Sequence, residues 1–64
     1  MTTEDFINYA KSFGYGIQFT GIGMAYVTLG DIKLTETMDT HLANNALAQI
    51  GMAIMVDTLR TENW

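Results

Sequence analysis

The chain contains no cysteine, no proline and a single histidine, His41, among its 64 residues. Disulfide cross-links and zinc sites built from cysteine are therefore excluded, and one imidazole cannot build a metal site alone. A domain of this size buries only about 60% of the surface of its unfolded chain, so it usually needs a disulfide, a metal or a partner chain. Oligomerisation is the option that remains, and we expect one domain over residues 1–64 with no cofactor.

Basic residues are also scarce. Only Lys11, Lys33 and Arg60 stand against seven acidic residues, which gives a net charge of −4. Because proteins bind phosphates through clustered Lys and Arg, nucleic acids and anionic membrane surfaces are not expected partners. The longest apolar run, near Ile50–Val56, is far shorter than the roughly 18 residues that span a bilayer, and no basic leader precedes an apolar stretch. We expect a soluble, cytoplasmic protein, located in the host cytoplasm if it is viral.

The first predicted element is a helix. It begins at Thr2 and Thr3, where a hydroxyl N-cap is followed by the acids Glu4 and Asp5. Gly14 supplies the left-handed conformation that ends it. Its apolar residues recur at i, i+3, i+4 and i+7 on one face: Phe6, Tyr9, Ala10 and Phe13.

The segment from Tyr15 to Thr37 changes to a period of two, which predicts three antiparallel strands. Gly30 and Asp31 suit a two-residue type II′ hairpin, and residues 21–23 suit a three-residue loop. The first loop pairs Phe19 with Ala25 and Thr20 with Met24, and the second pairs Leu29 with Ile32 and Tyr26 with Thr35. Both registers place Val27 on the buried face. That face is expected to carry Ile17, Phe19, Ala25, Val27, Leu29, Ile32 and Leu34; the other is expected to carry Gln18, Thr20, Met24, Tyr26, Thr28, Lys33 and Thr35.

A second helix is predicted from the N-cap Asp39 to about Arg60. A broad apolar stripe should face the sheet: Leu42, Ala43, Ala46, Leu47, Ile50, Ala53 and Ile54. The predicted fold is therefore α+β: a helix, a three-stranded antiparallel β-meander and a helix (αβββα), with both helices on one face of the sheet.

The last helix has more apolar surface than one small sheet can cover. Ala48, Met52, Met55 and Leu59 recur at spacings of four, three and four, typical of a narrow helix-packing seam, with Asn45 one step earlier. Leaving these side chains in water would forgo roughly 1.5–3 kcal/mol for each Met or Leu. Either the first helix covers them, or they pair with the same seam of a second copy, since twofold homodimers are the commonest oligomers. These five residues are the predicted partner or dimer interface.

A second contact face is predicted on the outer side of the sheet, where Tyr26 is flanked by Met24 and Gln18, since Tyr and Met are enriched at interfaces. The alternative is an ordinary solvated sheet face. Trp64 belongs to the same hypothesis, because an apolar ring at the end of the chain either folds back or docks into a neighbour.

No pattern of catalytic or metal-binding residues is found. His41 lies beside Asp39, but no nucleophile is spaced to join them, so a solvated or capping histidine is expected. The glycines of residues 14–23 lack the lysine of a phosphate loop, and the seven acids do not form a calcium loop. Two carboxylates from distant elements could still converge. We expect no catalytic, cofactor-binding or metal-binding residue, and no enzyme activity.

The expected order of elements resembles that of the double-stranded-RNA-binding domain, which also ends in an Ala-rich helix. That family carries a cluster of lysines at the start of its last helix. This chain has Asp39, Thr40, His41 and Asn44 there and no lysine, so the resemblance is one of shape and does not imply RNA binding.

Small size, acidity and the lack of recognisable chemistry also resemble the small inhibitors that phages and mobile elements encode against host enzymes, including anti-CRISPR proteins. The functional hypothesis is a non-enzymatic protein-binding inhibitor or regulator that is homodimeric and binds a further protein partner. A structural or assembly subunit of a larger complex is the alternative, and an enzyme or small-ligand binder is the third class.

Overall fold

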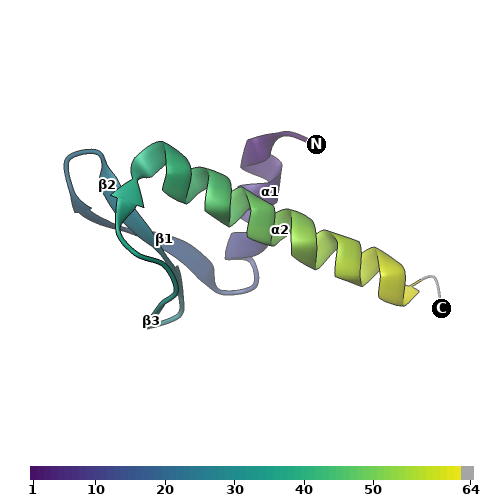
Figure 1. Cartoon of the computed structure of the whole chain (residues 1–64). Helices are drawn as coiled ribbons and strands as arrows, with labels where there is room; N and C mark the ends of the chain where they lie inside the picture. Colours follow the sequence, from purple (N-terminus) through teal and green to yellow (C-terminus); the bar gives the residue numbers. More distant parts are fainter. Residues whose placement is uncertain (63–64) are drawn as a thin grey trace.

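The structure is a computed structural model, and it describes residues 1–62, with side chains for residues 1–61. In the sequence, one helix precedes and one follows a small antiparallel sheet. The order is α1 (Thr3–Lys11), β1 (Tyr15–Gly21), β2 (Met24–Leu29), β3 (Ile32–Lys33), β4 (Met38–Asp39) and α2 (Thr40–Glu62), as Figure 1 shows. The predicted α+β fold, with a helix on each side of a meander in the sequence, is confirmed.

Helix α1 begins in a reciprocal capping box. The backbone N–H of Thr2 donates to Asp5 Oδ2 at 2.9 Å, and the backbone N–H of Asp5 donates to Thr2 Oγ1 at 3.2 Å. Two amides that have no partner inside the helix are satisfied in this way. At the other end Gly14 has a φ of 97°, which confirms its predicted role in ending the helix.

The first hairpin keeps most of its predicted register, with the pairs Ile17–Val27, Gln18–Tyr26 and Phe19–Ala25. The prediction is wrong at the tip, where Met24 pairs with Gly21 instead of Thr20. Thr20 is the extra residue of a β-bulge, so the loop has two residues and ends on Gly23, whose φ is 73°. The backbone N–H of Thr40 donates to Gly23 O at 2.9 Å and ties this tip to the start of α2.

The second hairpin turns at Gly30, whose φ of 58° suits the first position of a type II′ turn, and the predicted pair Leu29–Ile32 is present. The predicted third strand is interrupted: β3 ends at Lys33, and β4 lies beyond Thr37, where the predicted strand segment ended. The interruption lies at Thr35, whose Oγ1 accepts a hydrogen bond from the backbone N–H of Val27 at 3.1 Å. Because a side chain takes the place of a backbone acceptor, the expected pairing of Thr35 with Tyr26 is wrong, and the strand resumes later.

Helix α2 begins as predicted, because Asp39 Oδ1 accepts a hydrogen bond from the backbone N–H of His41 at 2.8 Å. The helix has 23 residues and is therefore roughly 35 Å long, whereas the seven residues of β1 span roughly 24 Å. Figure 1 shows its last turns projecting beyond both the sheet and α1. No helix within residues 1–62 is long and apolar enough to cross a membrane.

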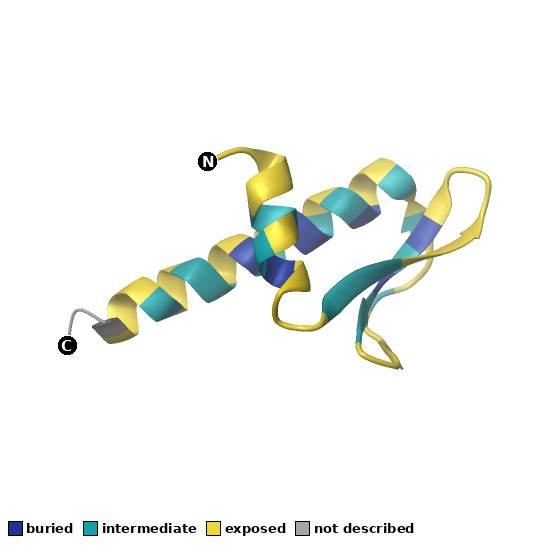
Figure 2. Cartoon of the chain, turned by 180° about the vertical axis from the view of Figure 1, so that it is seen from behind, coloured by how far each residue is buried: buried dark blue, intermediate teal, exposed yellow. Residues whose placement is uncertain are grey.

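The core is small. Ala10 of α1, Val27 of β2 and Leu47 of α2 form its buried cluster, so both helices pack on the same face of the sheet. Figure 2 shows how few segments are fully buried. Among the described residues, Val27 and Leu47 are the largest side chains with no exposed surface. Each contributes about 1.5–3 kcal/mol, so little apolar burial holds the monomer together.

Part of the predicted buried face is wrong. Phe19 and Ile32 are both 61% exposed, and Leu34 and Leu42 are also exposed. The reason is the path of α2, which packs against β1, β2 and β4 and does not reach β3 in the described part of the chain. The tip of the first hairpin, where Phe19 lies, is also left uncovered. The sheet therefore has an apolar face wider than the helices can shield.

Candidate interaction surfaces

The two helices cross with their backbones in contact at Gly51. This residue is buried, and a Cβ atom at its position would overlap the carbonyl group of Phe6. About two turns further along α2, the hydroxyl of Tyr9 donates to Thr58 Oγ1 at 3.4 Å, and the Thr58 hydroxyl donates to the carbonyl of Ile54 at 2.9 Å. Sequence reasoning missed Gly51, although a lone glycine inside a helix signals a close approach.

The crossing divides the predicted seam between the interior and the surface. Among the predicted seam residues, Ala48 is only 6% exposed and Met55 is half-buried. Asn45, Met52 and Leu59 are exposed. One part of the predicted seam is therefore buried within the chain, and the other part is left exposed.

Six exposed residues of α2 form a regular row that we call the outer stripe. Its members are separated by three, four, three, four and three residues, the spacing of positions a and d in a coiled coil. All of them are exposed: Leu42, Asn45, Gln49, Met52, Val56 and Leu59. The spacing is visible in the sequence, but the polar Asn45 and Gln49 conceal it from a search for apolar residues alone.

The outer stripe carries no charge along most of its length. From Leu42 to Val56 the helix has no Asp, Glu, Lys or Arg, and its first charged residue after that segment is Asp57. The solvated face of a helix in a monomeric protein is normally rich in charged residues, whereas a helix that is apolar or uncharged all round is normally buried. The composition of the outer stripe therefore departs from that of an ordinary solvated helix face.

The predicted second contact face is only partly exposed. Met24 and Gln18 are exposed, and Tyr26 is half-buried with Lys33 Nζ 4.8 Å from the centre of its ring. The side-chain amide of Gln18 donates to the carbonyl of Phe19 at 3.2 Å. The predicted contribution of Trp64 lies outside the described residues. Gln18 and Tyr26 are paired across β1 and β2, so these two residues are brought together as the register required.

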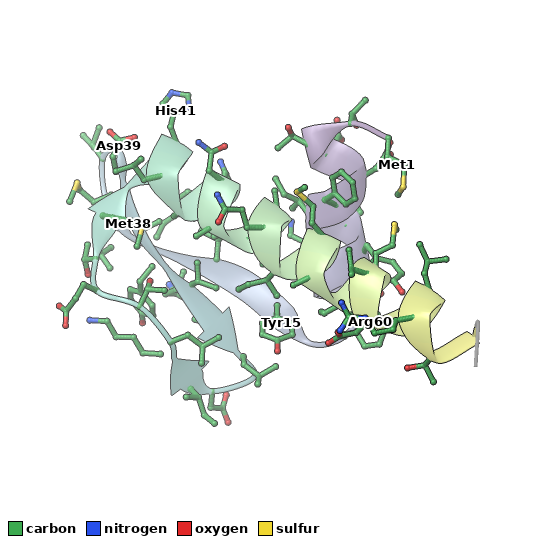
Figure 3. All side chains as sticks on the ribbon, turned by 45° about the vertical axis from the view of Figure 1, so that its right-hand side comes forward. Met1, Tyr15, Met38, Asp39, His41 and Arg60 are labelled. Atoms are coloured by element: carbon green, nitrogen blue, oxygen red, sulfur yellow. The ribbon has the colours of Figure 1, made fainter. Side chains whose placement is uncertain are left out.

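The polar side chains do not converge on a reactive centre in the described part of the chain. His41 is exposed at the start of α2, and Figure 3 shows it far from Arg60 at the other end of the helix. Within residues 1–62 no three His, Asp or Glu side chains come close enough together to hold a metal ion. A shallow, open depression lined by Ile54, Asp57, Thr58 and Thr61 lies along a single helix, and it cannot enclose a small molecule.

One carboxyl group has an altered acidity. The hydrogen bonds from the backbone N–H and the side chain of Thr2 lower the pKa of Asp5 below its ordinary value. Asp5 is fully exposed at the start of α1. This shift therefore reports the capping box and not a catalytic site.

Comparison with known proteins identifies no relative: no family model matches the chain, and no curated protein and no solved structure shows significant similarity to it. The function therefore has to be argued from the surfaces themselves. The outer stripe is the surface whose composition departs furthest from that of an ordinary solvated helix.

Proposed function

We propose that this chain is a non-enzymatic protein-binding protein that works as a homodimer, paired through the outer stripe of α2. The observation that carries the proposal is the row of exposed, uncharged a and d positions from Leu42 to Leu59. A second copy is a fitting occupant because the stripe is free of charge, so a twofold axis brings no like charges together.

The two amides of the stripe favour a parallel pair. In parallel register each residue faces its own counterpart, so Asn45 meets Asn45 of the partner and Gln49 meets Gln49 of the partner, and these amides can hydrogen-bond to each other. Full antiparallel overlap would place Asn45 opposite Val56 and Gln49 opposite Met52. Each buried amide without a partner costs about 1–3 kcal/mol, which disfavours that arrangement.

The affinity should be modest. Four apolar side chains of each copy (Leu42, Met52, Val56 and Leu59) are about half exposed in the monomer, so burying the rest should contribute roughly 1 kcal/mol each. The resulting gain of roughly 8 kcal/mol per dimer competes with an association cost of about 4–15 kcal/mol. At the lower end of that cost the net gain is about 4 kcal/mol, which corresponds to a Kd of about 1 mM, so the dimer should form at millimolar protein concentration.

Light scattering during size-exclusion chromatography tests the proposal. At millimolar concentration the wild type should be at least dimeric, and Met52→Glu with Val56→Glu should lower the particle mass while leaving the far-ultraviolet circular dichroism unchanged. Ile22→Glu with Ile32→Glu is the matched control, because it adds the same charge at exposed apolar positions outside α2. A monomeric wild type, or an unchanged mass in the stripe variant, would contradict the proposal.

The wider role that we propose is inhibition of another protein, such as a host defence protein blocked by a phage or mobile element. The net charge of −4 would steer the dimer toward a basic target, and apolar contacts would supply the affinity. A pull-down followed by an activity assay of the retained protein tests this role. Loss of its activity on addition of the dimer is expected; a stable complex with full activity would favour an assembly subunit instead, and retention of no specific protein would contradict both roles.

A further inference from the structure

Strand β1 lies at the edge of the sheet, with β2 on one side only. The backbone N–H of Gly30 donates to the carbonyl of Gly14 at 3.0 Å, and this bond shows which residues of β1 hydrogen-bond to β2. In an antiparallel ladder the residues that bond to the neighbour alternate with residues that point away. Gly16 and Gln18 therefore bond to β2, and the outward N–H and C=O groups belong to Tyr15, Ile17 and Phe19.

The opposite side of β2 confirms this alternation. Val27 faces Ile17, and its own backbone groups point away from β1: its carbonyl accepts from the N–H of Leu34 at 2.9 Å, and its N–H donates to Thr35 Oγ1 at 3.1 Å. The outward backbone groups of β1 have no comparable partner strand. Among these outward groups, within the described residues, only the carbonyl of Phe19 accepts a hydrogen bond, from the side-chain amide of its neighbour Gln18.

The free edge lacks the features that normally prevent strands from pairing. Proteins protect such edges with charged residues, proline or very short strands. Strand β1 has seven residues, and residues 12–30 contain no charged residue and no proline. Phe19 also stands 61% exposed on the face of the sheet that carries the helices. The edge is therefore open in both its backbone and its side chains.

We propose that β1 pairs with β1 of a second copy, antiparallel about a twofold axis at Ile17, so that the two sheets become continuous. This register opposes the outward groups of Tyr15 to those of the partner's Phe19, and Ile17 to the partner's Ile17, which allows six backbone hydrogen bonds. The axis is perpendicular to the sheet, so the helices of both copies stay on the same face.

A second copy fits this edge because the edge is complementary to itself. In the proposed register the exposed Phe19 stands beside the half-buried Tyr15 of the partner subunit, where each ring covers the other. On the opposite face Gln18 lies against Gly16 of the partner subunit, which has no side chain to obstruct it. No like charges meet, since the strand has none. The pairing is separate from that of the outer stripe and joins stripe-paired dimers into a larger closed or open assembly.

Cysteine cross-linking tests the register, because the natural chain has no cysteine. Gly16→Cys and Gln18→Cys proteins, mixed and oxidised, should give a covalent dimer of one chain of each kind, since facing residues of this type have Cα atoms about 4.5 Å apart, within the range of a disulfide. A Cβ at Gly16 would lie 3.3 Å from Thr28 Oγ1, which a small adjustment accommodates. Gln18→Cys mixed with Ile22→Cys is the control and should give little product.

Light scattering supplies a second readout. Phe19→Lys should lower the particle mass at high concentration, whereas Ile22→Lys, with the same charge on the tip of the same hairpin, should not. The variant with Met52→Glu and Val56→Glu should still form the Gly16–Gln18 cross-link, so failure of stripe pairing is distinguishable from failure of edge pairing. Folded proteins that yield no mixed cross-link, or a Phe19→Lys protein of unchanged mass, would overturn the proposal and leave the edge to an extended segment of another protein.

Discussion

Replacement of Gly51 by alanine should destabilise the chain, although alanine favours a helix by about 1 kcal/mol over glycine. The added Cβ would overlap the backbone carbonyl of Phe6, and a backbone atom cannot rotate away as a flexible side chain can. Helix α1 as a whole must shift, and it carries Ala10 of the core with it. Overpacking of this kind costs about 1–3 kcal/mol or more.

The expected net loss is about 2 kcal/mol, because the cost lies toward the upper end and the gain in helix propensity offsets part of it. At roughly 0.05–0.15 kcal/mol per residue, 64 residues give a free energy of unfolding of about 3–10 kcal/mol, so the loss is a large fraction of the total. The midpoint of thermal unfolding should fall by about 8–16 °C.

Urea unfolding followed by circular dichroism measures this loss, with every protein at one fixed concentration because association adds to stability. Gly21→Ala is the matched control: a Cβ there meets nothing within 4 Å, and Gly21 is not among the positive-φ glycines. Its stability should change by less than about 1 kcal/mol. A Gly51→Ala protein as stable as the wild type would refute the close crossing of the helices.

Three further outcomes are expected. Asp39→Ala should lower the free energy of unfolding by about 1 kcal/mol in urea titrations, since it leaves the backbone N–H of His41 without its acceptor. The pKa of Asp5, followed by NMR of its carboxyl carbon, should lie below its ordinary value and should rise in Thr2→Ala. Because the pKa is lower in the folded state, ionised Asp5 stabilises the fold at pH values above the unfolded-state pKa. This stabilisation is lost as the pH falls through the folded-state pKa. Leu47→Ala should lower the free energy of unfolding by about 2–5 kcal/mol in urea titrations, so a cooperative transition near that of the wild type would argue against the small core.

The size of the core and the extent of the exposed apolar surface have one origin. A sheet with strands of two to seven residues cannot cover a helix of 23 residues, and α1 contacts α2 on one side only, at Gly51 and at Thr58. What remains outside is the outer stripe, together with Phe19 and Ile32 on the sheet. Pairing with a second copy would bury this surface without a longer chain, and the proposed contacts through the outer stripe and through the edge of β1 are both of this kind.

Local signals determined most of the fold. The capping box at Thr2, the turn at Gly30 and the N-cap Asp39 act within three residues of themselves, so the sequence specified them without reference to the rest of the chain. The alternation of apolar and polar residues over two hairpins was sufficient to place Val27 in the core, because a strand register involves only adjacent segments of the chain.

Only the tertiary structure decided which apolar side chains are covered. The angle at which α2 crosses the sheet exposes Ile32, and the backbone contact at Gly51 buries Ala48 on one side of α2 while Met52 stays in solvent. Neither outcome follows from periodicity, since a period defines the width of an apolar stripe and not the position of the element that covers it. The sequence by itself determined that α2 has surplus apolar surface, and the packing of α1 and the sheet decided that this surplus is the outer stripe, because two elements in contact must fit each other in shape.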